Sequence, residues 1–104
     1  MALCLLYCTA SSEAEASKIS RILLEKNLVA CSNIVSKSKS LFKWKSKVKS
    51  TREVVFILKS QRSKLKQVLS QIKKHHSYEC PCVVEIPISR GNPDFLKWIK
   101  NETT

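Results

Sequence analysis

Glycine, proline and long apolar runs are scarce in this 104-residue chain, which has one glycine and three prolines. A single glycine leaves no glycine-rich loop to cradle a phosphate, and no proline-rich or Ser/Gly-rich run marks an interdomain linker. No apolar run approaches the ~20 residues of a transmembrane helix, and residues 1–9 lack the basic start and cleavage site of a signal peptide. We therefore expect one domain over residues 1–104, located in the cytoplasm and without membrane insertion.

Disulfide bonds are not expected either, although the chain has five cysteines. Their number is odd and their spacing irregular, which argues against a disulfide framework and for reduced thiols. The pair Cys80 and Cys82, with Pro81 between them, lacks the two-residue spacing of a redox or zinc motif, and no second pair completes a Cys4 set. Cys31 is interpreted as a core residue, because most unpaired cysteines behave as small buried hydrophobes.

Acidic residues are few: there are eight against 19 lysines and arginines, for a formal net charge of +11. Such a charge favours solubility and non-specific attraction to polyanions. Six lysines occupy odd positions between 37 and 49, namely Lys37, Lys39, Lys43, Lys45, Lys47 and Lys49. Because side chains alternate along a strand, a strand here would put them on one face. With Phe42 and Trp44 interleaved, that face predicts polyanion contact; a solvated lysine face that protects a strand edge is the alternative.

Hydrophobic periodicity predicts alternating strands and helices. Ser12 is suited to cap a helix over residues 12–27, which Asn27 can end in the left-handed region. The other expected elements are strands at 2–9, 29–44, 47–59 and 82–88, a helix at 63–75 and a short final helix that begins at Asn92-Pro93. The second and third strands form a long hairpin that turns at Lys45-Ser46. The order βαββαβ is typical of an α+β ferredoxin-like sandwich, an antiparallel sheet with two helices on one face.

The segment 75–82, His-His-Ser-Tyr-Glu-Cys-Pro-Cys, concentrates the groups that can bind a metal. In a regular helix or strand, His75 and His76 would point in different directions, so both can hold one ion only if the helix has ended before them. Ions shared with a neighbouring subunit are one alternative. Another is a structural role at the helix C-terminus, where imidazolium groups favour the helix dipole.

Along nearly its whole length the chain resembles the CutA family of divalent-cation-tolerance proteins. The resemblance lies in the order and spacing of several segments: Leu-Tyr-Cys-Thr-Ala at 6–10, Leu-Val-Ala-Cys-Ser-Asn-Ile at 28–34, Trp44 with Lys47, Ile-Leu-Lys-Ser at 57–60, His-His-Ser-Tyr-Glu-Cys-Pro at 75–81, Pro-Ile at 87–88 and Gly-Asn-Pro-Asp-Phe-Leu-Lys-Trp at 91–98. It implies a stable homotrimer in which long hairpins extend neighbouring sheets. It also implies binding of copper or similar ions in a response to metals. We expect no catalysed reaction, because the sequence shows no oxyanion hole and no orienting carboxylate for a cysteine–histidine pair, and we expect no metal to be needed for folding.

The resemblance further implies where ions and ligands would bind. Cys8, His75 and His76 fall on the positions assigned to metal in similar bacterial members, and a thiolate with two imidazoles suits Cu(I), Cu(II) or Zn(II). For Cys8 a place in the core is the alternative reading. An intersubunit cleft is expected around Trp44, Lys47, Tyr78 and Glu79, although packing roles would also explain Trp44 and Tyr78.

Three departures from the family pattern argue against acid-base chemistry in that cleft. They are Lys45-Ser46 after Trp44 in place of Glu-Gly, Ser77 in place of proline, and Cys82 in place of an acidic residue. The last removes a carboxylate partner for Lys47. The other functional hypotheses are a trimeric scaffold that anchors partners, and a polyanion-binding module that uses the basic face.

Overall fold

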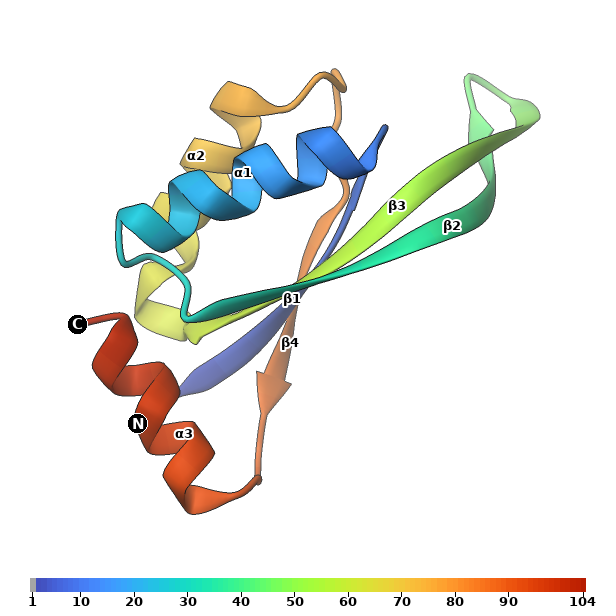
Figure 1. The fold of residues 1–104 in the computed structure, drawn as a ribbon. Helices are drawn as coiled ribbons and strands as arrows, with labels where there is room; N and C mark the ends of the chain where they lie inside the picture. The colour runs from blue at the N-terminus through green and yellow to red at the C-terminus, as the bar shows by residue number, and fades with distance from the viewer. Residues whose placement is uncertain (1) are drawn as a thin grey trace.

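A computed structural model describes residues 2–104 and shows one four-stranded antiparallel sheet (Figure 1). The strands are β1 (Leu3–Ala10), β2 (Cys31–Trp44), β3 (Lys47–Gln61) and β4 (Val83–Ile88), arranged in the order β2-β3-β1-β4. The predicted ferredoxin-like α+β fold is therefore confirmed, with every strand within two residues of its expected bounds. Among the described residues, no helix is long and apolar enough to cross a membrane.

Two helices, α1 (Glu13–Glu25) and α2 (Leu65–His75), lie on the same face of the sheet (Figure 1). The Ser12 hydroxyl accepts a hydrogen bond from the Glu15 amide at 3.1 Å and so caps α1, as predicted. After α1 the chain reverses at Asn27, whose φ of 57° lies in the left-handed region. The third helix, α3 (Pro93–Glu102), packs at the start of β1, where Ile99 is fully buried.

The main core lies between the sheet and the helices α1 and α2. The even residues of β1 face these helices and are completely buried, and they pack with Phe56 and Leu58 of β3 and with the apolar stripes of the helices. The odd residues point to the opposite face. Tyr7 is paired there with Ile57 on one side and with Val84 on the other. None of the helices in residues 2–104 covers this part of the sheet, and Tyr7, Val84 and Ile86 stay 37%, 51% and 46% exposed.

The β2–β3 hairpin extends away from the body of the protein (Figure 1). It closes through a two-residue turn in which Lys45 and Ser46 both have positive φ, 51° and 67°, the geometry of tight hairpin turns. A bulge interrupts β2 between Val35 and Ser38, and Lys37 takes a φ of 64° there.

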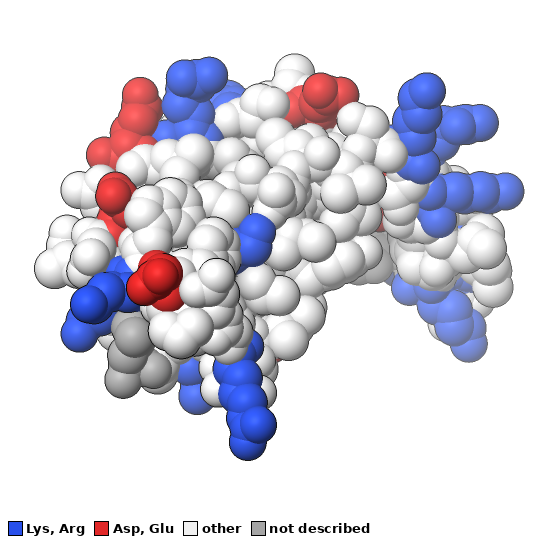
Figure 2. Space-filling model, turned by 60° about the horizontal axis from the view of Figure 1, so that its bottom comes forward, with Lys and Arg blue, Asp and Glu red and all other residues white. Residues whose placement is uncertain are grey.

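The six lysines of this region do not share one face, and the expectation of a single basic face is wrong. Lys43 pairs with Val48, whereas Lys47 pairs with Trp44 and Lys49 with Phe42. Since cross-strand partners point to the same side, Lys39 and Lys43 lie on one face of the hairpin, and Lys47 and Lys49 lie on the other. The two-residue turn causes the split, because it pairs odd positions of one strand with even positions of the next. Figure 2 shows basic side chains projecting to opposite sides at this end of the molecule.

Candidate functional site

His76 directly follows α2 and is held by the main chain through both ring nitrogens. Its side chain is completely buried, its Nε2 lies 2.8 Å from the Thr9 carbonyl oxygen, and its Nδ1 accepts a hydrogen bond from the Tyr78 amide at 3.1 Å. These partners fix a neutral imidazole that carries its proton on Nε2 and donates it to Thr9. His76 therefore ties the end of α2 to the end of β1, and a metal could reach it only by displacing one of these bonds.

Cys8 and His75 lie in different surroundings. Cys8 is completely buried on the helix-covered face of β1, and its Sγ lies 3.7 Å from the Leu6 carbonyl oxygen. Burial, with a smaller effect from Cys82, raises the pKa of the Cys8 thiol to about 12, so it stays protonated at neutral pH. His75 is the last residue of α2 and is partly exposed.

The three residues do not form one ligand set within the chain. Among residues 2–104, no group of three His, Cys, Asp or Glu side chains is placed to hold a metal ion. A metal ligand must be a deprotonated thiol or a nitrogen with a free lone pair. His76 has no free ring nitrogen, and the described residues bring no third ligand to the buried Cys8, so the set implied by the family resemblance is not assembled within one chain.

Glu15 anchors the segment that follows α2, a role that the sequence interpretation missed. Its carboxylate accepts hydrogen bonds from the Ser11 amide and hydroxyl, both at 2.9 Å, and from the Ser77 amide at 2.8 Å. Burial on its own would raise the pKa of Glu15, but these hydrogen bonds outweigh burial and lower it to about 2. The Ser-x-x-Glu spacing at residues 12–15 was the available signal, since it is typical of a capping box.

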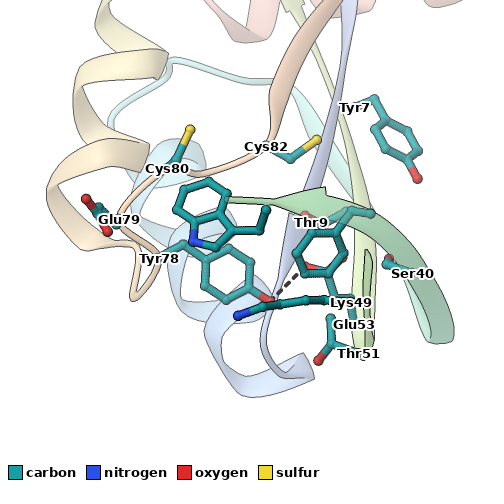
Figure 3. Close-up of a pocket in the computed structure, with 12 residues that line it drawn as sticks. Tyr7, Thr9, Ser40, Lys49, Thr51, Glu53, Tyr78, Glu79, Cys80 and Cys82 are labelled. Atoms are coloured by element: carbon teal, nitrogen blue, oxygen red, sulfur yellow. Dashed lines mark hydrogen bonds between the residues drawn. The ribbon is translucent and has the colours of Figure 1, made fainter. Parts of the chain in front are cut away.

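A cavity of about 610 Å³ lies between the hairpin and the segment that leads into β4 (Figure 3). Its lining includes Phe42 and Trp44 of β2, Lys49 and Glu53 of β3, and Tyr78, Glu79, Cys80 and Cys82 from the segment before β4. Three of the four residues expected in a cleft are therefore brought together. Lys49 lines the cavity, and Lys47 is not among the lining residues.

Tyr78 closes one side of this cavity through a hydrogen bond to the hairpin. Its hydroxyl donates to Glu53 Oε2 at 2.7 Å (Figure 3). Burial first and the Glu53 carboxylate second raise the pKa of Tyr78 well above its usual range, so the phenol acts as a donor and not as an anion. Glu53 carried no signal in the sequence, because its contact with Tyr78 spans 25 positions and depends on the hairpin register.

Cys80 and Cys82 line the same cavity, and both are free thiols. Cys80 is exposed and Cys82 is partly exposed. Burial raises the pKa of Cys82, and a hydrogen bond with the Thr9 side chain partly offsets that effect. Cys31, expected in the core, is also partly exposed, and its Sγ accepts a hydrogen bond from Lys59 Nζ at 3.4 Å.

Comparison with known proteins places the chain in a family. The profile of the family described as "CutA1 divalent ion tolerance protein" matches residues 4–102. The divalent-cation tolerance protein CutA of Archaeoglobus fulgidus is 44% identical over 94 residues, which are 90% of this chain and 91% of that protein. Human protein CutA is 31% identical over 97 residues, which are 93% of this chain and 54% of the human protein. The chain thus spans only about half the length of its human relative.

Solved structures agree with this placement. The Archaeoglobus structure, described as a periplasmic divalent cation tolerance protein, superposes with a TM-score of 0.95 at 40% identity and covers 98% of this chain and 99% of its own. The divalent cation tolerance protein of Thermus thermophilus superposes with a TM-score of 0.96 at 29% identity, with the same coverage. From its sequence and its fold together, the chain belongs to the CutA1 family of divalent ion tolerance proteins.

Proposed function

We propose that this chain forms a homotrimer that binds divalent metal ions, copper among them, in a response to metals, and that it catalyses no reaction. Membership of a divalent ion tolerance family supports the metal part of the proposal. The assembly part rests on one observation, the apolar sheet face that none of the described helices covers. The five free cysteines suit a reducing compartment, and we propose the cytoplasm as the location.

The uncovered sheet face has the composition of a protein interface. Tyr7, Val84 and Ile86 stay between about a third and a half exposed, and Val55 and Ile57 beside them are partly exposed. Contiguous apolar patches of this kind are uncommon on monomeric proteins and mark interaction sites. A second and a third copy of the chain would bury the face and would also cover the open edges of the sheet.

The hairpin offers a second region for contact between copies. Leu41 and Val48 lie on its outer part and are 68% and 73% exposed. They stand on the same side of the hairpin as Lys43, because Lys43 pairs with Val48 and Leu41 lies two residues away in β2. A neighbouring subunit that receives the hairpin would shield these two side chains from water.

The assembly is tested by native mass and sedimentation of Val84→Glu, with Leu24→Glu as the matched control. Leu24 is also an exposed apolar residue, at 39%, but it lies on α1 and not on the sheet face. We expect the wild type and Leu24→Glu to be trimers, and Val84→Glu to dissociate because it places charges in the interface. A monomeric wild type, or a trimer that tolerates Val84→Glu, would contradict the proposal.

The metal ligands that we propose are Cys8, His75 and His76, which the family resemblance implies. The geometry adds a restriction, because these three residues do not form one ligand set within a single chain. His75 is the partly exposed member of the set, so an ion bound there has to be shared with other groups, including those of a neighbouring subunit. Titration of the trimer with Cu(II) tests this point. Loss of binding in His75→Ala, with the trimer mass unchanged, is the expected result; equal binding by the variant would remove His75 from the set.

Polyanion binding is the second candidate, and the hairpin gives it a specific basis. Lys39 and Arg52 are cross-strand partners, and like charges directly opposite each other are unfavourable unless an anion lies between them. Lys43 lies on the same face. Binding of single-stranded DNA at increasing salt tests this candidate: the logarithm of the affinity should fall linearly with the logarithm of the salt concentration, and Lys39→Gln/Arg52→Gln should reduce the slope.

A scaffold that anchors partners remains the third hypothesis, and it requires only the trimer.

A further inference from the structure

The two thiols of Cys80 and Cys82 lie in the same cavity and are separated by a single proline. Figure 3 shows both sulfur atoms projecting from the same side of the loop. Cys80 lies in a bend of the loop and Cys82 directly precedes β4, and the proline between them disfavours the helical region for Cys80. Proline also fixes its own φ, so the two thiols are held together with little conformational freedom.

A disulfide is a poor outcome for such a pair. Two residues of extended chain span about 6.6–7 Å between their Cα atoms, at or beyond the upper end of the range that a disulfide bridges. Both cysteines are free in the structure. A metal ion held by both sulfurs bridges a longer separation than an S–S bond does.

The surroundings of the pair limit which ion can bind. Among the described residues, no group of three His, Cys, Asp or Glu side chains is placed to hold a metal, so a tetrahedral ion such as Zn(II) would not find the three or four protein ligands that its sites usually have. Two thiolates are the ligands that a soft, low-coordinate ion such as Cu(I) prefers. Cys8, the nearest cysteine along β1, faces the core on the other side of the sheet and is not available to the pair.

We propose that Cys80 and Cys82 form a two-thiolate site for Cu(I) at the mouth of the cavity. This site goes beyond the proposed function, because it uses ligands other than Cys8, His75 and His76 and needs no second subunit. Two S–H bonds are replaced by two S–Cu bonds, two protons pass to solvent, and no electron is transferred. The complex carries one negative charge, which Lys49 in the same cavity and the net charge of the chain favour.

Aromatic side chains give this site a further property. Phe42, Trp44 and Tyr78 line the same cavity as the two cysteines, so apolar groups form part of the surroundings of the site. A hydrophobic surrounding limits the access of solvent to a metal, and here it would also limit the approach of competing thiols. Indole emission from Trp44 offers a direct report of occupancy, since the ring lies in the same cavity.

The test is an anaerobic Cu(I) titration of the full chain against a colorimetric chelator, on the wild type, Cys80→Ser/Cys82→Ser, Cys80→Ser and the matched control Cys31→Ser. Cys31 is a partly exposed thiol on β2 without a neighbouring cysteine in sequence. We expect one tightly bound ion per chain and two protons released in the wild type and in Cys31→Ser. Both variants at position 80 should lose about 100-fold or more in affinity, because a thiolate ligand is removed.

Several outcomes would overturn the site. One is equal Cu(I) binding by Cys80→Ser/Cys82→Ser and the wild type; another is loss of binding in Cys31→Ser. A third is displacement of Cu(I) by a tenfold excess of Zn(II), which would contradict a two-coordinate site. The trimer mass and the effect of His75→Ala on Cu(II) binding are measured separately, so failure of this site and failure of the proposed function give different results.

Discussion

The hydroxyl of Tyr78 donates a 2.7 Å hydrogen bond to Glu53 and so joins the segment before β4 to the hairpin at one side of the cavity. Tyr78→Phe removes the hydroxyl donor and leaves the partly buried Glu53 carboxylate without this hydrogen bond. We expect the free energy of unfolding to fall by about 1–2 kcal/mol, as for a hydrogen bond to a charged group. Urea denaturation measures this, with Tyr7→Phe as the control on the uncovered sheet face. Equal effects of the two changes would show that the bond is not stabilising.

Glu15 predicts a specific dependence of stability on pH. Its pKa in the folded protein is about 2, below the ordinary value of 4.5, so its contribution to stability is fully present above pH 4.5 and is lost as the pH falls towards 2. Glu15→Gln should cost about 1–2 kcal/mol at pH 7 and progressively less below pH 4.5. Thermal unfolding at several pH values measures the difference. The control is Glu13→Gln, a neighbouring carboxylate in the same turn, and a constant gap between wild type and Glu15→Gln at all pH values would contradict the prediction.

His75 and His76 should respond to substitution to very different extents, although they are neighbours. His76→Ala removes a completely buried ring and two hydrogen bonds to the main chain, so we expect a loss of about 2–4 kcal/mol. His75→Ala, at the partly exposed end of α2, should change stability by no more than about 0.5 kcal/mol. Guanidinium denaturation of the two metal-free variants makes the comparison. A similar loss in both would show that the two side chains have equivalent structural roles.

The hairpin turn predicts a stabilising double substitution. Lys45 and Ser46 both adopt left-handed backbone conformations, which asparagine and glycine tolerate better. Lys45→Asn/Ser46→Gly should therefore raise the free energy of unfolding by about 0.5–1 kcal/mol. Lys49→Asn/Ser50→Gly places the same residues in extended positions of β3 and should have the opposite effect. Melting temperatures of the two double variants decide the point, and a decrease in the first would contradict it.

Local patterns in the sequence were sufficient for the fold. The Ser12 cap, the left-handed Asn27 and the Asn92-Pro93 helix start each depend on residues only a few positions apart, and each is confirmed. The expectation of a single lysine face was wrong because the alternation of side chains describes one strand only. Which side chains of the two strands share a face of the hairpin depends also on the length of its turn. The contacts of Tyr78 with Glu53 and of His76 with Thr9 depend on tertiary packing across 25 and 67 positions, for which no local rule exists.

The two-residue turn at Lys45 and Ser46 has a consequence for the cavity, because it decides which charges reach the aromatic side of the hairpin. Lys49 stands beside Phe42 only because the turn pairs even positions with odd ones. A three-residue turn over residues 45–47 would instead pair Trp44 with Val48 and Phe42 with Ser50, and it would carry Lys49 to the side of Lys39 and Lys43. The cavity would then lose the Lys49 ammonium group. In this chain, the length of a loop thus decides which charge stands beside the aromatic side chains of the cavity.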